Sequence, residues 1–170
     1  MKIIALTGEP CSGKSSSLYH FGKLGARFLN FDHILATITD ARNYKNFSEA
    51  WKDYKSAYNE ALEFSKIKID EFRKSGSNAI LVFEANQWVV QSLEKHFDAI
   101  VKIQADEKIR VDRQMARTGK SKAEALISLI RIGDKSLKGD APVFIIDNNG
   151  GISELKQKVR KTWRKIAYLR

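Results

Sequence analysis

The sequence predicts an α/β protein in which a sheet of short strands lies between layers of helices. Three observations predict this class. Short apolar segments alternate with segments of helical spacing, a glycine-rich loop follows the first apolar segment, and carboxylates follow several later ones. With 170 residues, 43% of them apolar, the chain is expected to form one domain, residues 1–170, with a core of its own.

The first apolar segment, residues 2–7, has the composition of a buried parallel strand. Residues 8–15, GEPCSGKS, then match the pattern G-x-x-x-x-G-K-[ST], and residues 15–24 have helical spacing. Strand, glycine loop and helix in this order form the context of a phosphate-binding loop. The alternative is a chance match or a glycine turn with only a structural role.

The chemistry of this loop explains its residue types. Gly8 and Gly13 allow backbone conformations in which successive N–H groups point into one concavity. The positive end of the following helix favours a bound polyphosphate, Lys14 would reach the β- and γ-phosphates, and Ser15 would ligate Mg²⁺. The predicted nucleotide contacts are Gly8, Pro10, Cys11, Ser12, Gly13, Lys14, Ser15 and Ser16.

A second short strand is predicted over residues 25–31, and Asp32 follows it. Ligands of open α/β sheets collect at the carboxyl ends of the strands, so Asp32 is expected beside the phosphate loop. A carboxylate there can accept or orient the proton of an attacking hydroxyl during phosphoryl transfer. Asp is also a preferred helix N-cap, and the two roles are compatible.

Residues 46–74 contain no proline or glycine and have helical apolar spacing, which predicts one helix packed on the sheet or two helices with a break. The aromatic first half could instead form the wall of an acceptor pocket. We favour a core role, because such stripes are usually buried. The stripe comprises Phe47, Trp51, Tyr54, Tyr58, Leu62, Ile69 and Phe72, with Ser65 as a gap.

A third strand is predicted over residues 78–83, and Glu84 at its carboxyl end is a candidate to hold a Mg²⁺-bound water or the acceptor. A helix over 85–96 and a strand over 99–103 follow, and Asp106 begins the next helix.

The helix after Asp106 carries Arg113 and Arg117, which are four residues apart and share a face. Two arginines beside a turn can close over ATP and stabilise the transferring charge, although most helical arginines are simply solvated. Residues 121–124, SKAE, form a capping box that opens another helix. A fifth strand over 142–146, a turn over 147–151 and a helix over 153–169 complete the chain.

Thirty Lys and Arg stand against twenty Asp and Glu, a net charge of +10. This balance suits nucleic acid or small polyanionic substrates, and we expect the latter because no nucleic-acid recognition motif is present. The single cysteine, Cys11, excludes an intramolecular disulfide. No apolar run is long enough to span a membrane and no signal peptide is evident, so we expect a cytoplasmic protein.

Together these motifs resemble the dephospho-coenzyme A kinases. Residues 4–15 are similar to the opening strand and phosphate loop of that family, and residues 24–32 to the segment that ends in its catalytic aspartate. The other similar segments are 82–84 in the third strand, 113–117 and 121–125 in the lid, and 145–150 in the last strand and turn, near the adenine.

The resemblance implies a three-layer P-loop kinase fold with a five-stranded parallel sheet and a small helical lid in residues 113–138, and it puts residues 46–74 on the acceptor side. It also implies transfer of the γ-phosphoryl of ATP, with Mg²⁺, to the ribose 3′-hydroxyl of dephospho-coenzyme A. The implied roles are a base at Asp32, a clamp of Lys14, Arg113 and Arg117, and a nucleotide contact at Asn148.

The chain departs from the family pattern at several positions. Asn30 stands where the family has a first aspartate, Ile80 where it has a proline and Ile132 where it has a glutamine. The region between the second and third strands is shorter than in the family and lacks its His-Pro motif. A nucleoside or nucleoside-monophosphate kinase on the same fold, and a non-catalytic nucleotide-binding relative, are therefore the alternatives.

Overall fold

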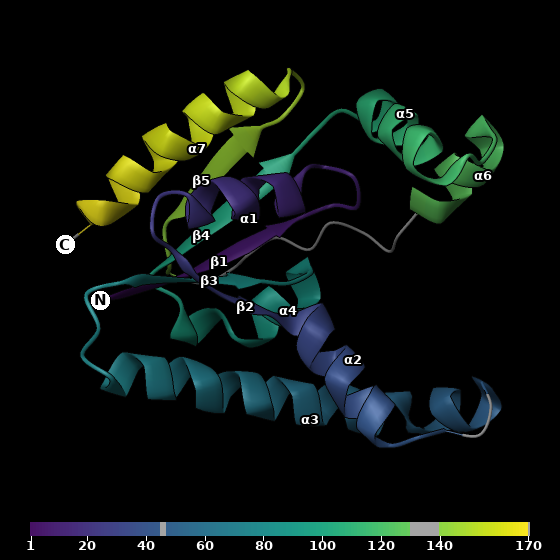
Figure 1. The fold of residues 1–170 in the computed structure, drawn as a ribbon, viewed down its shortest axis with the longest axis horizontal. Coiled ribbons are helices and arrows are strands. Elements are labelled where there is room, and N and C mark those ends of the chain that lie inside the picture. The colour runs from purple at the N-terminus through teal and green to yellow at the C-terminus, as the bar shows by residue number, and fades with distance from the viewer. Residues whose placement is uncertain (45–46, 130–139, 170) are drawn as a thin grey trace.

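A single five-stranded parallel sheet organises the chain. The computed structural model describes residues 1–44, 47–129 and 140–169. The strands lie in the order β2-β3-β1-β4-β5, so the first strand occupies the centre (Figure 1). All five predicted strands are confirmed: β1 (Lys2–Gly8), β2 (Arg27–Asn30), β3 (Ile80–Glu84), β4 (Ala99–Gln104) and β5 (Val143–Asp147).

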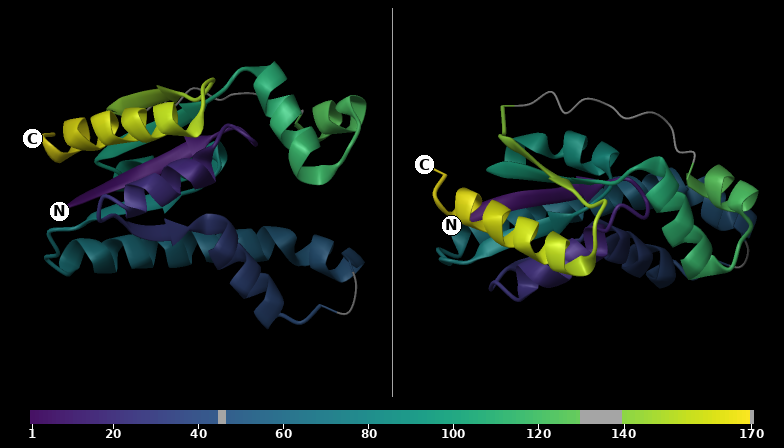
Figure 2. Two further views of the ribbon diagram at one scale, coloured as in Figure 1. Left: turned by 45° about the horizontal axis from the view of Figure 1, so that its top comes forward. Right: turned by 90° about the horizontal axis from the view of Figure 1, so that it is seen from above.

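Helices connect the strands and cover both faces of the sheet (Figures 1 and 2). The helix predicted over 85–96 is shorter than expected, because it stops at Ser92 and a 3₁₀ turn (Glu94–His96) follows. Residues 130–138 of the predicted lid, Ile132 among them, lie outside the described residues. The helices are α1 (Lys14–Gly22), α2 (Phe31–Ala41), α3 (Phe47–Lys74), α4 (Gln87–Ser92), α5 (Glu107–Thr118), α6 (Lys122–Leu129) and α7 (Ile152–Ala167).

Two apolar cores lie on opposite faces of the sheet. On one face Phe21 of α1 and Val159 of α7 pack on Ile4 and Val101. The second core contains residues of α3 and α4, including Ile69, together with residues of the sheet. Residues 3–7 of β1 are all buried, as expected for a central strand covered on both faces. The sheet is therefore a rigid base for the loops at its carboxyl edge.

The long helix α3 is continuous, so the prediction of one helix is confirmed and the alternative of two helices with a break is wrong. Ser65 is buried in it and donates its hydroxyl to the carbonyl of Ala61 at 2.7 Å, so the gap in the stripe is satisfied locally. Tyr58, Leu62, Ile69 and Phe72 contribute to the core, as predicted.

None of the helices in the described ranges is long and apolar enough to span a membrane.

The core prediction is wrong for the beginning of the stripe. Trp51 is 68% exposed and Tyr54 is 44% exposed. The amino-terminal half of α3 runs beyond the sheet and packs beside α2, so no strand lies there to bury these rings (Figure 1). The side chain of Phe47 lies outside the described part of the chain.

Candidate active site

The phosphate loop joins β1 to α1 and requires both of its glycines. Gly8 has φ +149° and Gly13 has φ +105°, a region that L side chains rarely adopt. A Cβ on Gly8 would lie 2.1 Å from the carbonyl oxygen of Ile103, and one on Gly13 would lie 2.1 Å from Nδ2 of Asn148. Conformation and available space therefore both demand glycine at the two ends of the loop.

Asn148 supports this loop through a hydrogen bond to its backbone. Its buried side chain donates from Nδ2 to the carbonyl oxygen of Ser12 at 2.7 Å. The resemblance implied a nucleotide contact for Asn148, but its amide is turned to the loop backbone and does not line the pocket. It holds the loop in shape, and this contact spans 136 residues of sequence.

The three arginines of α5 have different partners. Arg110 is 7% exposed, and its Nη2 lies 3.3 Å from a carboxylate oxygen of Glu9 in the loop. Arg113 donates to the carbonyls of Cys11 and Ser12 at 3.3 Å each and to that of Asn148 at 2.8 Å. Arg117 alone of the three lines the pocket. Two arginines thus hold the loop, and the third faces the space where a ligand would bind.

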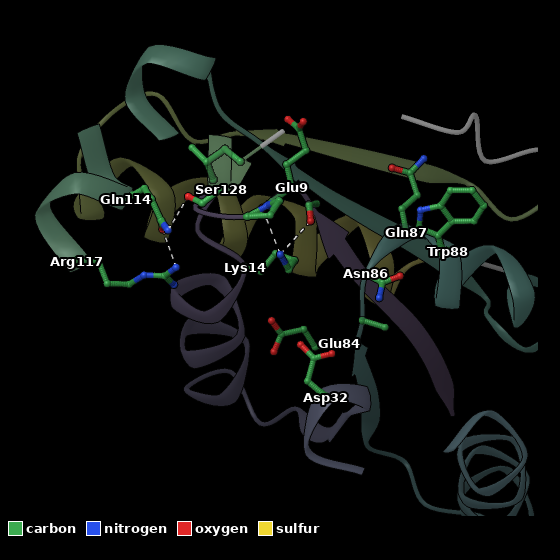
Figure 3. A pocket seen from close by; sticks show the side chains of 14 residues that line it. Glu9, Lys14, Asp32, Glu84, Asn86, Gln87, Trp88, Gln114, Arg117 and Ser128 are labelled. Carbon is green, nitrogen blue, oxygen red and sulfur yellow. Dashed lines mark hydrogen bonds between the residues drawn. The ribbon is translucent and has the colours of Figure 1, made fainter. Parts of the chain in front are cut away.

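A pocket of about 540 Å³ opens between the loop, α2, the end of β3 and the α5–α6 pair (Figure 3). It gathers Gly8, Pro10, Lys14, Asp32, Glu84 and Arg117 from the predicted set. The predicted residues that do not line it are Cys11, Ser12, Gly13, Ser15, Ser16, Arg113 and Asn148. Pocket residues that sequence reasoning missed include Glu9, Asn86, Gln87, Trp88, Gln114 and Ser128.

Lys14 projects from the first turn of α1 into this pocket. Its Nζ donates to the carbonyls of Gly8 at 2.9 Å and Glu9 at 3.2 Å. Figure 3 shows Asp32 and Glu84 turned toward the same hollow beneath Lys14. A cation and two carboxylates from three separate strand ends therefore share one site.

Asn30 organises the carboxylate side of the pocket. Its Oδ1 accepts from the backbone N–H of His33 at 2.9 Å, so Asn30 is the N-cap of α2. The N-cap prediction for Asp32 is therefore wrong, and Asp32 lies in the first turn of α2 instead. Nδ2 of Asn30 donates to Oε2 of Glu84 at 2.8 Å, which an ionised aspartate could not do. A helix-cap preference was the available sequence signal for Asn30, but its contact with Glu84 was not foreseeable.

The strand order, the phosphate loop after the first strand and the helical pair above the pocket define a P-loop kinase fold. Solved structures share this fold. A Thermus thermophilus structure, TT1252, superposes with a TM-score of 0.69 at 18% identity over 96% of this chain and 97% of that one. A Sinorhizobium meliloti gluconokinase gives 0.58 at 14% identity, covering 98% of this chain and 93% of that one.

Within that class, the chain is similar to the dephospho-CoA kinases. The enzyme of that name from Geobacter sulfurreducens is 24% identical, covering 97% of this chain and 98% of that protein. The one from Moorella thermoacetica is 26% identical over 61% of this chain and 49% of its own length. The dephospho-CoA kinase structure from Campylobacter jejuni has a TM-score of 0.64 at 17% identity, covering 97% of both chains. No family model matches the chain.

Proposed function

We propose that this protein transfers the γ-phosphoryl group of ATP to the ribose 3′-hydroxyl of dephospho-coenzyme A, the last step of coenzyme A biosynthesis, in the cytoplasm. The observation that carries the proposal is the joint presence of Lys14, Arg117 and Asp32 in one pocket at the carboxyl edge of the sheet. The similarity to a dephospho-CoA kinase over nearly the full length of both chains supports the choice of acceptor.

On the ATP side, the chain supplies positive charge and fixed donors. The N–H groups of the loop and the first turn of α1 surround the phosphates, while Lys14 and Arg117 compensate the charge that develops on the γ-phosphoryl oxygens. Arg113 acts through the backbone of the loop, because it donates hydrogen bonds to the carbonyls of Cys11 and Ser12 in the loop and of Asn148, which supports the loop.

The donors on this side also suit Mg²⁺ bound together with ATP. The described residues contain no group of three or more His, Cys, Asp or Glu that could hold a metal by themselves. Mg²⁺ typically binds through one or two protein oxygens, waters and substrate phosphates. Glu84 in the pocket would supply one such oxygen, and Ser15, which follows Lys14 in the first turn of α1 but does not itself line the pocket, would supply the other. When bound, it would neutralise charge on the phosphate oxygens.

On the acceptor side, Asp32 accepts the proton of the 3′-hydroxyl. The hydroxyl oxygen then forms a bond to the γ-phosphorus, the bond from that phosphorus to the β–γ bridging oxygen breaks, and ADP leaves. Glu84, held by Asn30, also lines the pocket, and its alternative to a role toward Mg²⁺ is to orient the ribose.

A row of aromatic rings leads outward from this point. Phe31, next to Asp32, packs edge-on against Tyr58 with ring centroids 5.2 Å apart. Tyr58 contacts Tyr54, which stacks on Trp51, with 6.1 Å between centroids at each step. Burial, together with Tyr54 and Asp32, raises the pKa of Tyr58 above its ordinary value. Exposed rings are suited to stacking on a base, so Trp51 and Tyr54 at the outer end of this row are our candidate surface for the adenine of the acceptor.

The test is ADP release from ATP and Mg²⁺, with and without dephospho-coenzyme A, beside nucleosides and nucleoside monophosphates. Release that depends on dephospho-coenzyme A, and that Lys14→Ala abolishes, is the expected result. Release with a nucleotide acceptor instead would make this a nucleotide kinase, an outcome that the shortened region between β2 and β3 keeps open. ATP binding without transfer to any acceptor would identify a non-catalytic relative and overturn the proposal.

A further inference from the structure

The side chain of Gln114 connects three separate segments around the pocket. It is 7% exposed, on the inner face of α5. Its Oε1 accepts from Sγ of Cys11 in the phosphate loop at 3.0 Å and from Nη2 of Arg117 at 2.7 Å. Its Nε2 donates to Oγ of Ser128 on α6 at 3.1 Å (Figure 3). One amide therefore joins the loop, α5 and α6.

The orientation of this amide follows from its partners. A guanidinium has only donors, so the atom of Gln114 that faces Arg117 must be the oxygen. The nitrogen then points to Ser128, whose hydroxyl accepts this bond and donates its own proton to the carbonyl of Ala125 at 2.7 Å. The three contacts are mutually consistent in one orientation only.

We propose that Gln114 is a positioning residue that holds the Arg117 guanidinium at the pocket and joins the phosphate loop to the α5–α6 pair. This role rests on the proposed function, because the partner of Arg117 would be the phosphoryl group that is transferred. Arg117 makes no ion pair with any residue that the structure describes. A neutral amide fixes its direction and leaves its full positive charge for an anion.

The contrast with Arg110 explains why an amide is required. Glu9 lies against Arg110 and compensates its charge, which suits a structural role. A carboxylate at position 114 would do the same to Arg117, at the edge of the phosphate site. The amide oxygen of Gln114 orients the guanidinium of Arg117 as a carboxylate would, but it carries no negative charge.

The test compares Gln114→Leu and Gln114→Glu, each alone and combined with Arg117→Ala, by ATP affinity, by KM and kcat, and by thermal unfolding. Gln157→Leu and Gln157→Glu, on the exposed face of α7, are the matched controls. We expect Gln114→Leu to weaken ATP binding about tenfold, as Arg117→Ala does, and the double variant to lose little more. Gln114→Glu should keep the thermal stability yet also weaken ATP binding, and the Gln157 variants should leave it unchanged.

A different pattern would overturn the proposal. Unchanged ATP affinity in Gln114→Leu, or effects of Gln114→Leu and Arg117→Ala that multiply in full, would show that the two residues act independently. If Gln114→Leu does not fold, Gln114→Glu decides: wild-type ATP affinity in that variant would reduce Gln114 to a structural role. Because affinity is measured without an acceptor, a wild-type protein that binds ATP but transfers nothing would refute the proposed function alone.

Discussion

The two sides of the pocket are built in different ways. On the phosphate side, buried and half-buried polar groups hold the loop: Asn148 and Arg113 bind its carbonyls, and Gln114 binds the thiol of Cys11. On the acceptor side, α2 and α3 project past the sheet and leave Trp51 and Tyr54 exposed. The side proposed for the phosphates is therefore preorganised by hydrogen bonds, whereas the side proposed for the acceptor presents exposed rings.

The polar contacts that join α2 to α3 are also more exposed to solvent than those that hold the phosphate loop. Arg42, just after α2, pairs with Asp53 and Glu60 of α3, and Tyr44 donates to Asp53 at 2.6 Å. The hydrogen bonds to Glu60 and Asp53 raise the pKa of Arg42, and those from Tyr44 and Arg42 lower the pKa of Asp53. Exposed pairs of this kind are screened by solvent, so we expect the acceptor side to be the more easily perturbed.

The largest expected effect is on turnover, which requires both sides of the pocket. Asp32→Asn should lower kcat about 10²- to 10⁴-fold while ATP affinity stays near that of the wild type, because it removes the proton acceptor and spares the loop. Steady-state kinetics and ATP binding measure this. Asp40→Asn, on the exposed end of α2, is the control. Wild-type turnover in Asp32→Asn would exclude Asp32 as the base.

A second prediction concerns the rigidity of the phosphate side. Gly13→Ala should lower the free energy of unfolding by about 1–3 kcal/mol and impair ATP binding. Alanine would be strained at the φ of this position, and its Cβ would displace Asn148 from Ser12. Gly25 also has a φ that strains an alanine, +93°, but a Cβ added there would meet nothing within 4 Å, so Gly25→Ala is the control. Denaturant unfolding of both variants separates the steric clash from backbone strain. Equal losses would mean that the contact with Asn148 contributes nothing.

On the acceptor side, Trp51→Ala should raise the KM for the acceptor about tenfold, the loss of about 1.4 kcal/mol of stacking, and leave the KM for ATP unchanged. Stability should change little, since the ring is exposed. Phe64→Ala removes another exposed ring of α3 and is the control. An equal rise in both KM values would argue against separate roles for the two sides.

The smallest effect is a pH dependence of the α2–α3 contact. Because the pKa of Asp53 is lowered from its ordinary value of 3.8, its contribution to stability is present above that value and is lost as the pH falls through the lower folded value. Amide NMR signals near Arg42 should therefore be constant from pH 7 to about 5 and shift below about 4. Arg42→Ala should reduce this shift. An unchanged titration in that variant would assign the shift to another group.

The sequence by itself determined the elements that depend on neighbouring residues. The phosphate loop with its required glycines, the five strands and the buried half of α3 follow from local composition and period. The capping box is also confirmed: the N–H of Ser121 donates to Glu124 at 2.9 Å, and that of Glu124 to the hydroxyl of Ser121 at 3.3 Å. Asp32 was placed correctly because the carboxyl ends of parallel strands meet at one edge.

Only the tertiary structure decided which of the polar residues meet. Arg113 and Arg117 lie on one helix with equivalent sequence signals, yet Arg113 binds loop carbonyls and only Arg117 lines the pocket. The Gln114 contact with Cys11 and the Asn30 contact with Glu84 join residues distant in sequence. Periodicity predicts which face of a helix is buried, but the partner of a buried polar group depends on how the chain brings distant segments together.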